Sequence, residues 1–298
     1  MRMPNVGQTL VFAAPIIFVL LWSTGYLSGR ILRPYVDPLT FSAVRFGAAS
    51  AILVLIAVVR GASFPKDLGT WLHLSICGVL IQGFFIAGML IAVNDGLEMG
   101  TAALVGGMQP IMTALLAAVW LKERFSTVQQ AGFLFGFLGL VLVLWQGLNL
   151  GDIPINALLI GVLAVAGITL GTLYQKRYVT SVDLLSGTAI QFAAAFVPVF
   201  VLAYFFENGR IDWNPTVIAT AVWLVVVQSI GAVLILFSLI RKGAVSRVSS
   251  LFYLVPPICA IQGYYLFDER LSATQIVGIL IVAVSVIVIT RESGGRAH

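Results

Sequence analysis

Long apolar stretches separated by short polar breaks run through the whole chain. Ten of them can be distinguished, and each is long enough to cross a hydrocarbon core about 30 Å thick as a helix. The breaks carry residues typical of turns, such as Arg33-Pro34 and Asn208-Gly209. The predicted spans are residues 10–29, 38–59, 71–93, 100–121, 127–147, 154–175, 184–206, 215–240, 246–267 and 272–290. We therefore predict an all-α integral membrane protein of ten transmembrane helices.

The composition excludes an ordinary soluble protein. Apolar residues make up 60% of the 298 positions and charged residues only 10%, whereas soluble domains contain about 25% charged residues. Ten spans leave roughly ten residues for each connection or tail, so no sizeable domain fits outside the bilayer. The net charge is +5, but no basic run exceeds two residues, and we expect no nucleic-acid partner.

The distribution of lysine and arginine predicts the orientation. Eleven of them fall in loops on the side of the N-terminus and four on the opposite side. Because cytoplasmic loops retain an excess of these residues, we expect both termini in the cytoplasm and a location in the inner (plasma) membrane.

The second half of the chain repeats the first at a constant offset of 146 residues. Matched polar residues and prolines carry this observation, since matched leucines mean little in such a composition. The matches include Gly25 with Gly171, Asp37 with Asp183, Phe46 with Phe192, Gln82 with Gln228, Pro110 with Pro256, and Glu123-Arg124 with Glu269-Arg270. Each copy contains five spans, an odd number, so the second copy enters the membrane from the opposite side. We predict two inverted five-helix repeats, residues 1–148 and 149–298.

These repeated segments resemble a known family. The stretch MQPIMTALLAAVWLKERFSTVQQAGFLFGFLGLVLVL and its echo LVPPICAIQGYYLFDERLSATQIVGILIVAVSVIVI are similar to the tandem EamA-type repeat of the drug/metabolite transporter superfamily. The opening LLWSTGYLSGR and the later VRFGAAS fit the same pattern. The resemblance implies a ten-span carrier of small organic metabolites, with the YddG-like amino-acid exporters as the most similar branch in length and layout.

The resemblance also implies residues for a substrate route. The first and sixth spans line it in the family, which points to Trp22, Tyr26 and Tyr174, although packing or a lipid-facing aromatic belt would also explain such residues. Beside the fourth-span proline, Met108-Gln109 replace the aromatic residues frequent in that branch. We therefore do not expect selectivity for aromatic substrates alone.

Gln82 and Gln228 are our leading candidates for substrate binding. Each lies about eleven residues into its span, which at about 1.5 Å per residue is near mid-depth. An amide facing lipid is costly, so both should face protein or a wet cavity. Their donors and acceptors suit a zwitterion. A hydrogen bond between helices that joins the two halves is the alternative interpretation.

The mid-span prolines Pro110 and Pro256 should kink the fourth and ninth helices, because proline removes a backbone donor and clashes with the preceding turn. Gln109 and Tyr253 are polar groups near these kinks, and together with Met108 they join the substrate-binding candidates. Carbonyls freed by the prolines would line a pathway, but we favour a role in shaping the helices.

Arg45 is the one cation well inside the second span. It could meet a substrate carboxylate through two parallel hydrogen bonds. It lies only eight residues from Asp37, however, and we favour local pairing or snorkelling of its long side chain.

The acidic residues all fall at or beyond the predicted span ends. Proton and sodium relays generally use a carboxylate inside the membrane, so the pattern favours facilitated transport. No metal site or catalytic constellation can be assembled from Cys77, Cys259 and the single interior histidine, His73. We expect no cofactor, no metal and no enzymatic activity.

Together these observations predict a carrier that exports neutral, hydrophobic and aromatic amino acids or related small metabolites by alternating access, as a monomer or homodimer. The proposed cavity lies between spans 1, 3, 4, 6, 8 and 9. The alternatives are a drug or other metabolite carrier of the same fold, or an integral membrane protein that does not transport.

Overall fold

The computed structural model describes residues 6–97, 99–145, 154–267 and 272–292, and these residues are almost entirely helical. The elements are α1 (Val6–Leu32), α2 (Pro38–Val59), α3 (Leu68–Gly78), η1 (Val79–Ala87), α4 (Gly88–Asn94), α5 (Met99–Gly106), α6 (Gln109–Trp120), α7 (Thr127–Leu144), α8 (Ile155–Tyr178), α9 (Leu184–Phe206), α10 (Pro215–Val222), η3 (Trp223–Ala232), α11 (Val233–Lys242), α12 (Val245–Ser250), η4 (Leu251–Leu254), α13 (Val255–Phe267) and α14 (Ala273–Glu292).

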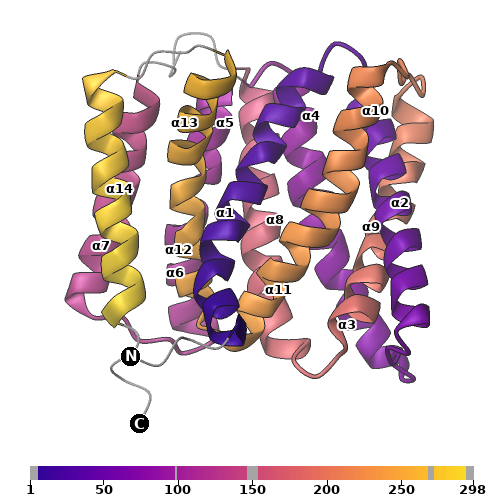
Figure 1. The fold of residues 1–298 in the computed structure, drawn as a ribbon, viewed down its shortest axis with the longest axis horizontal. Coiled ribbons are helices and arrows are strands. Elements are labelled where there is room, and N and C mark those ends of the chain that lie inside the picture. Colours follow the sequence, from indigo (N-terminus) through magenta and orange to yellow (C-terminus); the bar gives the residue numbers. More distant parts are fainter. Residues whose placement is uncertain (1–5, 98, 146–153, 268–271, 293–298) are drawn as a thin grey trace.

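The helices stand side by side in one bundle, with the start of α1 and the end of α14, the helix ends nearest to the termini along the chain, at the same end (Figure 1). Within the described ranges, nine helices are long and apolar enough to cross a membrane. The remaining predicted span, 246–267, is formed by α12, η4 and α13. The prediction of an all-α membrane fold is confirmed.

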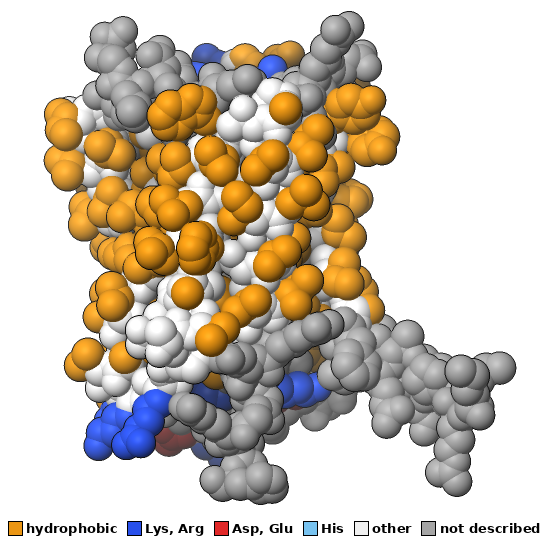
Figure 2. Space-filling model, turned by 90° about the vertical axis from the view of Figure 1, so that its left-hand side faces the viewer, with side chains coloured by type: hydrophobic (Ala, Val, Ile, Leu, Met, Phe, Trp, Pro, Cys, Tyr) orange, Lys and Arg blue, Asp and Glu red, His pale blue; other side chains and the backbone are white. Residues whose placement is uncertain are grey.

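The outer surface is apolar between two charged ends. Figure 2 shows an orange belt over most of the height of one face, with blue side chains below it. Large apolar side chains such as Leu55, Val119 and Phe206 are 64–81% exposed on the bundle. In water this exposure would be unfavourable, but lipid tails solvate these groups, and the belt therefore marks the bilayer-facing surface.

The repeat is visible in the local structure of the two halves. Both third spans of the repeats contain a π-helical segment, η1 and η3, and these segments hold Gln82 and Gln228. Ser126 and Ser272 begin repeat-related helices with the same pair of bonds: each hydroxyl accepts from the N–H of the glutamine three residues on, whose side chain accepts from the serine N–H. These matches support two inverted five-helix repeats.

The two halves meet along repeat-related helices. Helix α2 packs against α9, and α7 packs against α14. At the first contact the repeat mates Phe46 and Phe192 touch each other, with ring centroids 5.8 Å apart and no exposed surface on either side chain. This pair therefore lies where the pseudo-two-fold axis passes between the halves.

Both mid-span prolines lie where the helical geometry changes. Pro110 follows a break at Gly107-Met108 and occupies the first turn of α6, where a missing N–H costs little. Pro256 follows the 3₁₀ turn η4 and opens α13. The proposed boundary at residues 148 and 149 lies outside the described residues, as do Glu98, Asp152 and the matched Glu269-Arg270.

Candidate functional site

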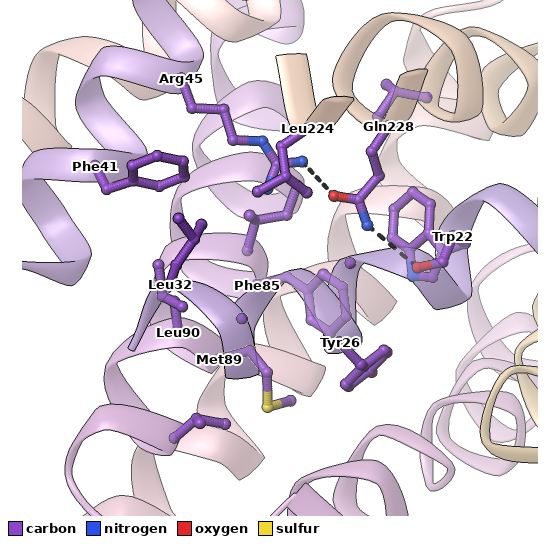
Figure 3. Close-up of a pocket in the computed structure, with 15 residues that line it drawn as sticks. Trp22, Tyr26, Leu32, Phe41, Arg45, Phe85, Met89, Leu90, Leu224 and Gln228 are labelled. Atoms are coloured by element: carbon purple, nitrogen blue, oxygen red, sulfur yellow. Dashed lines mark hydrogen bonds between the residues drawn. The ribbon is translucent and has the colours of Figure 1, made fainter. Parts of the chain in front are cut away.

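A pocket lies between the two halves, in the part of the bundle away from the chain termini. It encloses about 750 Å³ of space, counted out to its open mouth. Helices α1, α2, α4 and α11 and the segments η1 and η3 supply its lining (Figure 3). The lining residues are Trp22, Gly25, Tyr26, Gly29, Leu32, Phe41, Arg45, Phe85, Ile86, Met89, Leu90, Val93, Leu224, Gln228 and Val233. We call it the Arg45 pocket.

The Arg45 pocket extends from mid-depth to the surface. A smaller pocket shares Gly29, Leu90 and Val93 with it and continues to the exposed residues Arg33 and Asn94. The pocket is therefore continuous with the loops at the end of the bundle opposite the termini. In the present conformation that end is the open one.

Aromatic and aliphatic side chains form most of the pocket wall. The rings of Trp22 and Phe85 stack with centroids 6.2 Å apart, and Trp22 also meets Phe252 edge-on at 5.3 Å. Such contacts fix large apolar groups in place, so the wall is preformed. It offers an apolar side chain of a ligand a surface that displaces water.

One polar group of the pocket is charged. Arg45 is 7% exposed, and its Nε donates to Ser229 Oγ at 2.7 Å while a terminal nitrogen donates to Gln228 Oε1 at 2.7 Å. Among the residues described, none of its contacts is an ion pair with a carboxylate. The pocket therefore presents a buried positive charge that no described carboxylate neutralises.

The expectation that Arg45 pairs locally or snorkels is wrong. Its partners lie in the second repeat, more than 180 residues away. Asp37, the suggested local partner, instead accepts the backbone N–H of Arg210 at 2.8 Å. The reason is the packing of α2 against η3, which brings the guanidinium to Gln228 before it can reach the helix end.

Gln228 links this charge to the first helix. Its Nε2 donates to the carbonyl oxygen of Trp22 at 3.2 Å while its Oε1 accepts from Arg45, as Figure 3 shows. The approach depends on Gly25, because a Cβ there would lie 1.8 Å from Nε2 of Gln228. Thus Gly25 makes room for the amide that joins the two halves.

We expect Gly25→Ala to weaken substrate binding, because its methyl group forces the Gln228 amide away from Arg45 and Trp22. The guanidinium then leaves the position in which it meets a ligand carboxylate, and loss of one or two ligand hydrogen bonds at about 1 kcal/mol each corresponds to roughly a fivefold to thirtyfold weaker affinity. Transport kinetics in proteoliposomes measure the effect. Gly231→Ala is the matched control, since Gly231 lies outside the pocket lining and its Cβ would meet no atom nearer than 3.6 Å; an equal loss in both variants would contradict this interpretation.

The structure brings three of the predicted site residues into the Arg45 pocket and leaves five outside it. Trp22, Tyr26 and Gln228 line it. Outside it, the Tyr253 hydroxyl donates to the carbonyl of Phe133 at 2.9 Å, and that of Tyr174 lies 2.7 Å from His73 Nδ1. Gln82 and Gln109 are buried among the helices, and Met108 is partly exposed.

The spans that line the pocket also differ from the prediction. Spans 1, 2, 3 and 8 line it, so the second span contributes, whereas the predicted fourth, sixth and ninth spans do not.

The residues that sequence reasoning missed are mostly apolar. Phe41, Phe85, Met89 and Leu224 line the pocket, but in the sequence they are indistinguishable from core or lipid-facing residues. The only available signal was depth: Phe85 and Met89 lie one and two turns beyond Gln82 on the same span.

The described acidic side chains lie at the helix ends. Glu207 shows the pattern: its carboxylate accepts the backbone N–H groups of Leu39 and Thr40 at 2.8 and 2.7 Å, and so caps the start of α2. Glu123 similarly accepts the N–H of Val245 at 3.1 Å at the other end of the bundle. In the described ranges these groups hold helix termini and do not face the Arg45 pocket.

Comparisons with known proteins agree with this architecture. The model of the EamA-like transporter family matches residues 9–145 and 155–291, two segments displaced by the same 146 residues as the internal repeat. A solved crystal structure superimposes with a TM-score of 0.79 at 18% identity, covering 97% of this chain and 99% of the other, and supports the fold.

Curated relatives align over nearly the full length. The chain is 22% identical to the uncharacterized transporter YvbV of Bacillus subtilis, over 98% of this chain and 94% of that one. It is 25% identical to the uncharacterized inner membrane transporter YedA of Escherichia coli, over 94% and 90%. The same identity holds for protein PecM of Dickeya dadantii, over 95% and 91%.

Proposed function

The chain belongs to the EamA-like transporter family, and we propose that it exports neutral, hydrophobic and aromatic amino acids or related carboxylate-bearing metabolites across the inner membrane. The observation that carries the proposal is Arg45, a buried cation in an apolar pocket that no described carboxylate neutralises. A ligand carboxylate supplies the negative charge that pairs with the Arg45 guanidinium.

The geometry suits a small amphipathic acid. Arg45 uses two of its N–H donors on Ser229 and Gln228 and keeps others for a ligand. A guanidinium binds a carboxylate through parallel hydrogen bonds that are stronger than those between neutral groups. The stacked Trp22 and Phe85 then receive the apolar side chain of the ligand. Because a missing methylene is worth only about 1–3 kcal/mol in an apolar pocket, specificity among such side chains is broad.

Transport follows from the inverted repeats by alternating access. The halves meet along α2 and α9, and the substrate lies between them near mid-depth. The described acidic groups at helix ends offer no carboxylate relay at this depth, and the proposal is therefore facilitated transport. The positive-inside pattern supports cytoplasmic termini, and the Arg45 pocket then faces away from the cytoplasm.

The test is exchange of labelled leucine and phenylalanine by the purified protein in liposomes. We expect exchange well above protein-free vesicles, and at least tenfold weaker competition by isoamylamine, which is leucine without its carboxylate, because a charge-assisted pair is worth about 1.5–3 kcal/mol. Collapse of a proton gradient should leave the rate unchanged. Absence of exchange for the whole amino-acid panel, or equal competition by the amine, would reject the proposed substrate class.

A drug or other metabolite carrier of the same fold is the second candidate. The aromatic cluster of Trp22, Phe85 and Phe252 favours it, because stacked rings suit planar aromatic cargo. Saturable uptake of an aromatic dye lacking a carboxylate, not displaced by leucine, distinguishes this function from amino-acid export.

A further inference from the structure

The Arg45 pocket has a counterpart in the other half of the bundle. At the repeat offset, Arg45 corresponds to Gln191, Gln228 to Gln82 and Gly29 to Gln175. A cavity lined by Gln175, Gly187, Thr188 and Gln191, among others, lies at the corresponding place and encloses about 160 Å³. We call it the Gln191 cavity. It is several times smaller than the Arg45 pocket, so the same repeat elements are open in one half and closed in the other.

Close contacts between helices close the second half. A Cβ on Gly78 would lie 2.1 Å from the backbone carbonyl oxygen of Gln191, and one on Gly171 would lie 2.5 Å from the side chain of Ile81. The segment η1 and the end of α3 are therefore pressed against α8 and α9. In the open half the counterpart of Gly78 is Leu224, which lines the Arg45 pocket.

The closed half contains amides whose hydrogen bonds are incomplete. Gln82 is 0% exposed, and within the described ranges neither its nitrogen nor its oxygen has a hydrogen-bond partner. Gln191 donates to Gln175 at 3.1 Å, but its own oxygen is buried with no partner among the same residues. An unsatisfied buried polar group costs about 1–3 kcal/mol, and proteins rarely retain several of them without a use.

We propose that Gln82, Gln175 and Gln191 form a second substrate site, which opens toward the end of the bundle that bears the termini when the Arg45 pocket closes. The inference rests on the proposed function, since it needs a carrier that alternates between two open states. If the two repeats exchange conformations, Gln82 takes the position in the first repeat that Gln228 now has in the second. Gln82 then lies beside Gln191, as Gln228 now lies beside Arg45. The unpartnered amides then bind the polar groups of the substrate.

The chemistry of the two sites differs. Arg45 gives the first a fixed positive charge, whereas three neutral amides supply donors and acceptors without charge in the second. Among the residues that line the Gln191 cavity, Asp183 and Arg241 carry opposite charges. The second site therefore accepts zwitterionic or neutral polar head groups, and it binds a carboxylate less strongly than the Arg45 pocket does.

Leucine exchange measured separately from the two faces of oriented proteoliposomes tests the second site. Gln82→Met and Gln191→Met should raise the KM about twofold to tenfold on the face bearing the termini, as expected for loss of one hydrogen bond, and leave the opposite KM unchanged. Gln228→Met, the repeat counterpart, should show the reverse. Gln82→Met should also keep or raise the Tm, because its amide has no partner to lose. An equal rise of KM on both faces, or a fall in Tm, would mean that these amides are merely structural.

Thiol labelling tests the opening itself and does not depend on the substrate. In a Cys77→Ala, Cys259→Ala background, Thr188→Cys reports the Gln191 cavity and Gly29→Cys reports the Arg45 pocket. A membrane-impermeant methanethiosulfonate should label Thr188→Cys only from the face bearing the termini and Gly29→Cys only from the other. No labelling of Thr188→Cys from its face would overturn the second site. Labelling without any leucine exchange would reject the proposed substrate and uphold the second opening.

Discussion

Arg45→Gln should weaken leucine binding by about ten- to a hundredfold and leave isoamylamine competition unchanged. The substitution keeps hydrogen-bonding groups beside Gln228 and Ser229 but removes the charge that pairs with the carboxylate. Charge-assisted hydrogen bonds are worth about 1.5–3 kcal/mol, and about 1.4 kcal/mol corresponds to a factor of ten. Equilibrium binding and exchange kinetics in proteoliposomes measure the loss for each ligand.

Binding and folding can be separated in the same variant. Because no described carboxylate compensates Arg45, its replacement removes an isolated buried charge, and we expect the Tm to stay or rise. Arg60→Gln, at the exposed end of the same helix, is the matched control and should behave like the unchanged protein. Equal losses for leucine and isoamylamine would show that Arg45 acts only by shaping the pocket.

Gly78→Ala should destabilise the present conformation by about 3 kcal/mol. The added methyl would lie 2.1–2.7 Å from backbone atoms of Gln191, which cannot rotate away as a side chain would, so α9 must shift. Overpacking of this kind typically costs about 1–3 kcal/mol and sometimes more. We expect a Tm lowered by roughly 5–10 °C, together with slower labelling of Gly29→Cys as the equilibrium moves toward the other open state.

Gly83→Ala provides a control on the same span with the opposite sign. Its Cβ would meet only Val199, at 4.0 Å, which is ordinary contact. Replacement of a helical glycine by alanine stabilises by roughly 0.5–1 kcal/mol where space allows, so its Tm should rise slightly. If Gly78→Ala and Gly83→Ala gave the same Tm, the close approach of α3 to α9 would not contribute to closure.

More of the fold than of the candidate site could be predicted from the sequence. Span lengths, the apolar composition and the 146-residue offset were sufficient for ten helices in two inverted repeats, because bilayer thickness and repeated polar positions leave few alternatives. Depth along the span singled out Gln228, and this residue lines the Arg45 pocket. The same reasoning pointed to Gln82, which lies at equal depth in the closed half and does not line the pocket. A sequence pattern does not specify which of the two halves is open in a given conformation.

Side-chain partners were the other limit. The polar tip of Tyr253 reads as a free group in the sequence, yet it donates to the carbonyl of Phe133. Arg45 has a carboxylate eight residues away in the sequence, but its partners come from the other repeat. In both cases the hydrogen bond joins helices that are distant along the chain. The periodicity of residues within one helix does not predict such a contact.

The contact between Phe46 and Phe192 has a consequence for energetics. These residues are repeat mates that touch each other, so exchanging the conformations of the halves maps the pair onto itself. In the proposed alternation, its interaction energy would be common to both open states and would cancel from the free-energy difference between them. Trp22 and Gly78 would meet different neighbours in the two states and would therefore determine that difference. The ring pair therefore stabilises the contact between the two halves. It does not change the relative free energies of the two open states.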